Sequence, residues 1–106
     1  YHARRLKMPG AARLGDIGSE HDCFPPTPII SASSGVFING QPAVRQGDAL
    51  QDHGCPCSEK PHGSHPRSIS GGSSGVLIDG KPAVRLGDAI DCGGTIASAS
   101  SDVMIG

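Results

Sequence analysis

Short apolar runs, bounded by turn residues, are the main pattern along this chain. Valine, isoleucine and leucine occur in small groups, and glycine, proline, asparagine and aspartate lie between them. No window places apolar residues at the 3.6-residue period of an amphipathic helix, whereas short apolar runs between turn signals are typical of strands. The pattern therefore predicts a mostly β protein without long helices.

An internal repeat is the strongest feature of the sequence. Residues 33–49, SSGVFINGQPAVRQGDA, match residues 73–89, SSGVLIDGKPAVRLGDA, at 13 of 17 positions. Each copy places Asn-Gly or Asp-Gly between apolar runs, which favours a hairpin because both central residues of a type I′ turn need a positive φ. Pro42 and Pro82 fall early in the return strand, where a residue without an N–H is tolerated. We expect two equivalent hairpins.

A third copy is divided between the two ends of the chain. Residues 100–106, SSDVMIG, match the first half of the repeat, and residues 9–16, PGAARLGD, roughly match the second half. The termini should therefore pair, and three units would close into a ring with approximate threefold symmetry. Since a lone hairpin is marginal in water, the units should share an apolar centre. We expect this centre to contain Val36, Ile38, Val76, Ile78, Val103 and Ile105.

Composition limits the class of protein. The chain has 106 residues, three aromatic residues and a formal net charge of −1. This length suits one domain of marginal stability, and the charge indicates no nucleic-acid partner. The apolar runs are far shorter than the roughly 20 residues that cross a bilayer, and no secretory leader is visible. Residues 1–7 are interpreted as a basic tail or a cloning remnant, which leaves residues 8–106 as the repeat domain.

A potential metal ligand follows the Gly-Asp step of each repeat. His21 and His53 lie five residues, and Cys92 four residues, after the corresponding aspartate. Under threefold symmetry these positions converge, and a closed tetrahedral zinc site needs a fourth ligand. The insertion at residues 53–67 offers Cys55, Cys57, His62 and His65. Zinc binding in small modules contributes about 10–16 kcal/mol, so the metal could decide whether the chain folds.

Other roles stay open for several of these residues. Cys23, Cys55 and Cys57 suit buried thiols, a disulfide from Cys23 to either of the others, or alternative ligands. His2 and His62 suit ordinary surface positions. Composition alone would also allow a small secreted binding module held by two disulfides. That alternative predicts no stoichiometric zinc and thiols that fail to react.

The segments MPGAARLGD, PAVRQGD, PAVRLGD and SSDVMIG resemble the PAAR-repeat family over residues 8–106. The Pro-Ala-Ala-Arg motif stands at residues 42–45 and 82–85, and the first copy carries one inserted residue. The resemblance implies a small pseudo-threefold cone of short hairpins, with one structural zinc ion near its apex. It assigns the zinc ligands to His21, His53, His65 and Cys92. His65 is preferred over His62 by its spacing to Gly72-Ser73, although Ser64 replaces the cysteine usual in the family.

The resemblance implies a non-enzymatic tip that caps the trimeric β-helical spike of a bacterial type VI secretion system, aiding membrane puncture and effector delivery. The partner would be the trimeric valine–glycine-repeat spike protein, with one copy of this chain per trimer. Toxin effectors and, transiently, the target membrane would be further partners. The chain would stay in the bacterial cytoplasm before firing and be delivered without a signal peptide.

Two alternatives remain from the sequence. The same tip could belong to a contractile phage tail or a related particle. A zinc hydrolase would need an open coordination position and a nearby base, for which Glu20 is a weak candidate.

Overall fold

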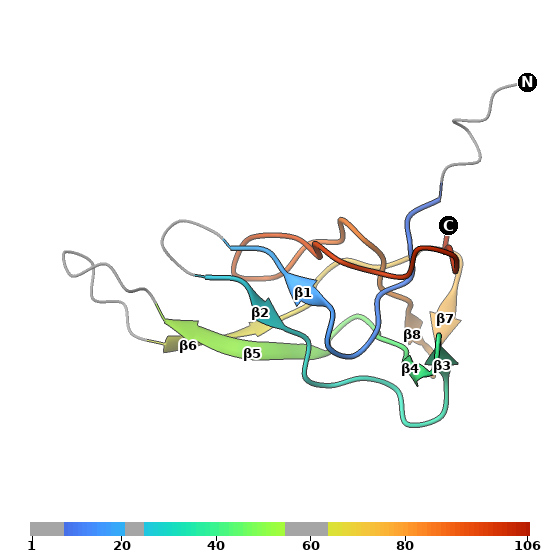
Figure 1. The fold of residues 1–106 in the computed structure, drawn as a ribbon, viewed down its shortest axis with the longest axis horizontal. Coiled ribbons are helices and arrows are strands. Elements are labelled where there is room, and N and C mark those ends of the chain that lie inside the picture. The colour runs from blue at the N-terminus through green and yellow to red at the C-terminus, as the bar shows by residue number, and fades with distance from the viewer. Residues whose placement is uncertain (1–7, 21–24, 55–63) are drawn as a thin grey trace, which may run out of the picture.

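The computed structural model describes residues 8–20, 25–54 and 64–106 (Figure 1). Its strands are β1 (Ile17–Gly18), β2 (Thr27–Pro28), β3 (Phe37–Ile38), β4 (Gln41–Pro42), β5 (Ala49–Gly54), β6 (Ser64–Ser68), β7 (Leu77–Ile78) and β8 (Lys81–Pro82). They pair antiparallel as β1–β2, β3–β4, β5–β6 and β7–β8. The expectation of a mostly β protein is confirmed. Within these ranges no helix is long and apolar enough to cross a membrane.

The two complete repeats form the predicted hairpins. β3 and β4 are joined by Asn39 and Gly40, whose φ angles are 54° and 79°, and β7 and β8 by Asp79 and Gly80, with φ angles of 55° and 79°. Positive φ at both central positions is the property of a type I′ turn. Asparagine, aspartate and glycine adopt this conformation more readily than other residues, so the Asn-Gly and Asp-Gly signals are confirmed.

The beginning and the end of the described chain pair with each other, as the divided third repeat predicts. The Ala11 amide donates to the Val103 carbonyl at 2.8 Å, and the Ile105 amide donates to the Pro9 carbonyl at 3.0 Å. The equivalent bond in the first complete repeat runs from the Ala43 amide to the Val36 carbonyl, at 2.9 Å. The halves at the two termini therefore make the same contacts as an uninterrupted hairpin.

A closed ring of backbone hydrogen bonds joins the three repeats. The Ala12 amide donates to the Val84 carbonyl at 2.9 Å, Val84 donates to Val44 at 3.1 Å, and Val44 donates back to Ala12 at 3.2 Å. A second set of three bonds links Leu14 to Pro42, Gln46 to Pro82 and Leu86 to Gly10, at 2.8–2.9 Å. Each repeat thus satisfies its backbone groups with both neighbours, which short hairpins could not do alone.

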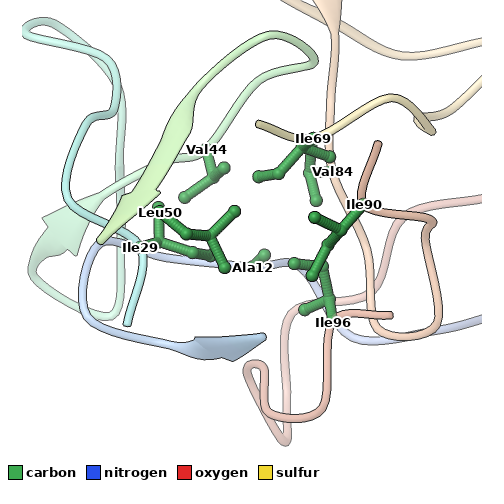
Figure 2. Packing of buried hydrophobic residues seen from close by; sticks show 8 residues of the cluster. All are labelled: Ala12, Ile29, Val44, Leu50, Ile69, Val84, Ile90 and Ile96. Carbon is green, nitrogen blue, oxygen red and sulfur yellow. The ribbon is translucent and has the colours of Figure 1, made fainter. Parts of the chain in front are cut away.

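The main apolar cluster lies between the three repeats and the segments that follow them (Figure 2). Its buried side chains point toward one another and belong to Ala12, Ile29, Val44, Leu50, Ile69, Val84, Ile90 and Ile96. The aliphatic residues after each Gly-Asp step, rather than those before the hairpin turn, make most of this core. We call these segments the arms: residues 17–30, 49–70 and 89–97.

The predicted apolar centre is only partly correct. Ile38, Ile78 and Ile105 are buried in a second cluster with Ala11, Ala43 and Ala83. The predicted Val36, Val76 and Val103 are instead exposed by 37–39%. These valines precede the strands and lie in turns closed by serine hydroxyls, which accept their amide protons at 2.9–3.0 Å. Strand alternation therefore does not extend to the valines.

The hairpins and the longest arm extend in different directions. β3, β4, β7 and β8 gather at one end with the C-terminal segment, and β5 and β6 extend away from it (Figure 1). We call the first region the hairpin end, comprising residues 36–41, 76–81 and 103–106. This arrangement separates the exposed turns of the repeats from β5 and β6, the strands that carry His53 and His65.

Candidate functional site

Two of the four predicted ligands occupy paired positions. His53 of β5 and His65 of β6 are register partners, and Gly54 pairs with Ser64 one step further along. The register shifts between Leu50 and His53, and such irregularities often redirect a strand. Opposite residues of an antiparallel pair have Cα atoms about 4.5–5.5 Å apart, so the backbone brings these two histidine positions together.

The third predicted ligand, Cys92, lies in a tight turn of the last arm. It is half-buried against the main apolar cluster, and its Sγ atom lies 4.0 Å from the Gly93 carbonyl oxygen. This turn is attached to the first arm, because the Ser19 amide donates to the Thr95 carbonyl at 2.8 Å and the Thr95 amide donates to Ser19 Oγ at 2.9 Å. Cys92 is thereby held beside the segment that precedes His21.

His21 lies outside the described residues, as do His2, Cys23, Cys55, Cys57 and His62. Among the side chains that the structure describes, no three His, Cys, Asp or Glu lie close enough to hold a metal ion. The predicted four-ligand site therefore remains a prediction.

A partly buried ion pair ends each repeat. Arg45 Nε and Nη2 donate to the two carboxylate oxygens of Asp48 at 2.9 and 3.0 Å, and the Arg45 amide donates to the same carboxylate at 2.8 Å. Arg13 with Asp16 and Arg85 with Asp88 repeat this arrangement. The pKa of Arg45 is raised above its ordinary value, and the side-chain hydrogen bond to Asp48 is the largest cause. This is expected for an arginine that binds a carboxylate through two hydrogen bonds. The arginine of the motif thus fixes the turn from which each arm begins.

Two further carboxylates link neighbouring repeats at the hairpin end. Hydrogen bonds from the Ser33 hydroxyl and then from Arg45 lower the pKa of Asp79 below its ordinary 3.8. Bonds from the Asn39 amide and the Ser100 hydroxyl lower the pKa of Asp102 in the same way. Both carboxylates are therefore charged at neutral pH and connect one repeat to the next.

Large apolar side chains protrude from the hairpin end. Phe37, Leu77 and Met104 occupy the same position of the three repeats and are exposed by 58%, 62% and 43%. The less exposed Val36, Val76 and Val103 precede them in the sequence. Three equivalent apolar side chains at one end of a small domain indicate an interaction surface.

Sequence reasoning missed the buried side chain of Arg67. This residue of β6 is only 1% exposed and bonds to Ser19, Thr27 and Gly93 in the other two arms. A comparison of the arms could have drawn attention to it. Arg67 lies two residues before Ile69, where the other arms have Thr27 before Ile29 and Gly94 before Ile96.

The family model of the PAAR motif matches residues 25–98, which include both complete hairpins, the second and third arms and the end of the first arm. The chain belongs to the PAAR-motif family. The match confirms the resemblance that the repeats carry. PAAR-motif proteins are structural proteins associated with the spike tips of contact-dependent secretion systems. A search of curated proteins finds no match to this sequence.

Proposed function

We propose that this chain is the non-enzymatic tip of a type VI secretion spike and that its hairpin end caps the trimeric valine–glycine-repeat protein. The observation that carries the proposal is the set of exposed residues Phe37, Leu77 and Met104 at equivalent repeat positions. Burial of a half-exposed side chain of this size contributes roughly 1 kcal/mol. Three such contacts at one end suit a stable cap on a partner that presents a complementary surface.

The stoichiometry in this proposal is one chain per trimer. The closed ring of bonds among Ala12, Val44 and Val84 supports approximate threefold symmetry within a single polypeptide. A surface with three equivalent apolar positions can meet three identical subunits with the same contacts. A homotrimeric partner therefore needs only one copy of the chain.

The proposal includes one structural zinc ion at the far end of the arms, held by His21, His53, His65 and Cys92. Imidazole and thiolate are ligands that zinc prefers, so these four residues would suit it. The paired positions of His53 and His65 support this assignment, because a single ion can bridge paired residues. The attachment of the Cys92 turn to Ser19 is also consistent with it.

In this function the zinc would secure a tip that has too few large side chains for its own core. The hairpin end would remain on the spike while the arms point toward the target membrane. The chain would be assembled in the bacterial cytoplasm and carried out with the spike, together with toxin effectors. No step of this function requires catalysis.

The test is binding to a purified spike trimer. The wild-type chain should form a complex of one chain and three spike subunits, measured by light scattering after size exclusion. The double variant Phe37→Ser/Leu77→Ser should keep its thermal midpoint, because both side chains are exposed, but lose binding. Ile30→Ser is the control, since Ile30 is exposed by 56% and lies outside the hairpin end. Three chains per trimer, or unchanged binding by the double variant, would contradict the proposal.

A further inference from the structure

The three arms meet around the side chain of Arg67. Arg67 Nη2 donates to the Ser19 carbonyl at 2.7 Å and to the Gly93 carbonyl at 3.3 Å, and Nη1 donates to Thr27 Oγ1 at 2.9 Å. One guanidinium group of the second arm therefore binds both the first arm and the third. Only arginine offers five donors in a rigid planar arrangement that can do this.

The buried guanidinium of Arg67 makes no direct ion pair within the described residues, although its charge acts on the nearby carboxylate of Asp91. Its neighbours are carbonyl groups and one hydroxyl, and its Nε atom has no hydrogen-bond partner in the described part of the chain. Burying a charge that is held mainly by neutral acceptors is costly. The fold accepts this cost at a point where described parts of all three arms meet, which indicates that the contacts themselves are needed there.

The other two arms provide the space that the arginine fills. The positions equivalent to Arg67 are Thr27 and Gly94. A Cβ atom on Gly94 would lie 3.2 Å from Arg67 Nη2 and 2.9 Å from the Ser19 carbonyl oxygen, which accepts a hydrogen bond from Arg67. A side chain at this position would therefore crowd both the guanidinium and its acceptor.

Arg67 also lies close in sequence to each arm's predicted zinc ligand. It follows His65 by two residues, its acceptor Ser19 precedes His21 by two, and its acceptor Gly93 directly follows Cys92. The guanidinium thus fixes the backbone next to a predicted ligand in all three arms.

We propose that Arg67 is a metal-independent clamp that joins the three arms and thereby positions the zinc ligands. The clamp holds the arms together in the absence of zinc, so that metal removal affects only the part of the arms beyond it. The clamping role does not depend on the zinc site, whereas the positioning role rests on the proposed function.

Amide hydrogen exchange in the zinc-free protein, followed by NMR, tests the clamp. In the wild type the Ser19 and Thr95 amides, which bond between arms, should stay protected after chelation. Arg67→Met should speed their exchange at least about tenfold relative to the Val44 and Val84 amides, since hydrogen bonds to a charged group are strong. Lys81→Met removes an exposed positive charge and should leave the exchange of both pairs of amides unchanged. Equal protection in Arg67→Met and wild type would overturn the clamp.

A milder variant covers the case in which Arg67→Met fails to fold. Thr27→Val removes one acceptor of Arg67 and keeps the shape of a buried side chain. It should speed exchange at Ser19 by a few-fold, and wild-type exchange in this variant would overturn the clamp.

The positioning role is tested by zinc affinity, measured by competition with a chelating dye. Thr27→Val and Arg67→Met should weaken zinc binding progressively, while Lys81→Met should bind as the wild type does. Wild-type affinity in Arg67→Met would overturn the positioning role. If the wild-type chain binds no zinc, the proposed metal site and this role both fail, while the exchange measurement still decides the clamp.

Discussion

His53 and His65 are register partners across β5 and β6, twelve residues apart in the sequence. A strand pairing that places two imidazole-bearing residues opposite each other offers a two-point attachment for a metal. His62, the alternative fourth ligand, lies outside the described residues. The pairing of His53 with His65 is consistent with His65 as a ligand, and the choice between His65 and His62 stays a prediction.

We predict that His53→Ala and His65→Ala each abolish stoichiometric zinc, because a closed tetrahedral site loses a ligand. Elemental analysis of the purified variants measures the zinc, and a fall in the thermal midpoint should accompany the loss. His62→Ala is the matched control and should retain one zinc per chain. Loss of zinc in His62→Ala with retention in His65→Ala would reverse the assignment.

The turn glycines provide a test of backbone conformation. Gly80 has a φ of 79°, and nothing lies within 4 Å of a Cβ atom placed there. Gly80→Ala should therefore destabilise the chain by about 1 kcal/mol through the left-handed backbone alone. Gly75→Ala is the control, because its Cβ would also meet open space but its φ lies outside the positive region. Chemical denaturation measures both, and equal effects would contradict the argument.

Two valines of the same repeat should differ in their contribution to stability. Val44 is fully buried in the main cluster, whereas Val36 is exposed by 38%. Val44→Ala should cost about 2 kcal/mol of unfolding free energy through lost burial and the cavity that remains. Val36→Ala should cost much less in the free chain. A larger loss in Val36→Ala would place the core where the sequence predicted it.

Stability should fall in acid as the carboxylates at the hairpin end are protonated. The folded-state pKa of Asp79 is lowered from 3.8 by bonds from Ser33 and Arg45. The stabilising contribution is therefore complete above pH 3.8 and is lost as the pH falls through the lower, folded-state value. Asp79→Asn should remove this contribution, because an amide has no charge to lose.

The asparagine variant is well suited to this measurement, since Asn39 adopts the same φ in the other repeat. Thermal midpoints recorded across the acid range should show the wild type more stable at neutral pH. The difference should shrink toward zero well below pH 3.8. A difference independent of pH would mean that the charge of Asp79 contributes nothing.

The sequence predicted the hairpins well because their signals are local. Asn-Gly and Asp-Gly determine the turn conformation almost alone, and the repeat made the pairing of the termini predictable. The buried set was harder to predict, because Val36 and Ile38 look equivalent in the sequence. Their burial differs because the Ser33 hydroxyl accepts the Val36 amide proton and holds it in a turn.

The spacing from the Gly-Asp step led to His21, His53 and Cys92, and the family resemblance led to His65. The structure pairs His53 with His65, and the four-ligand site stays a prediction. Arg67 was missed because a lone arginine in a polar insertion looks exposed. Its burial depends on three arms that are distant in the sequence, and no local pattern reports such a convergence.

The pairing of residues 9–11 with residues 103–105 allows the break in the divided repeat to be moved to another repeat. Because Pro9 and Ala11 bond to Ile105 and Val103 as a continuous strand pair would, a short peptide could connect Gly106 to Met8. The chain could then be cut at the Asp79–Gly80 turn, giving a circular permutant with the same contacts. Such a rearranged chain would show that the order of the repeats along the polypeptide is incidental to how they assemble.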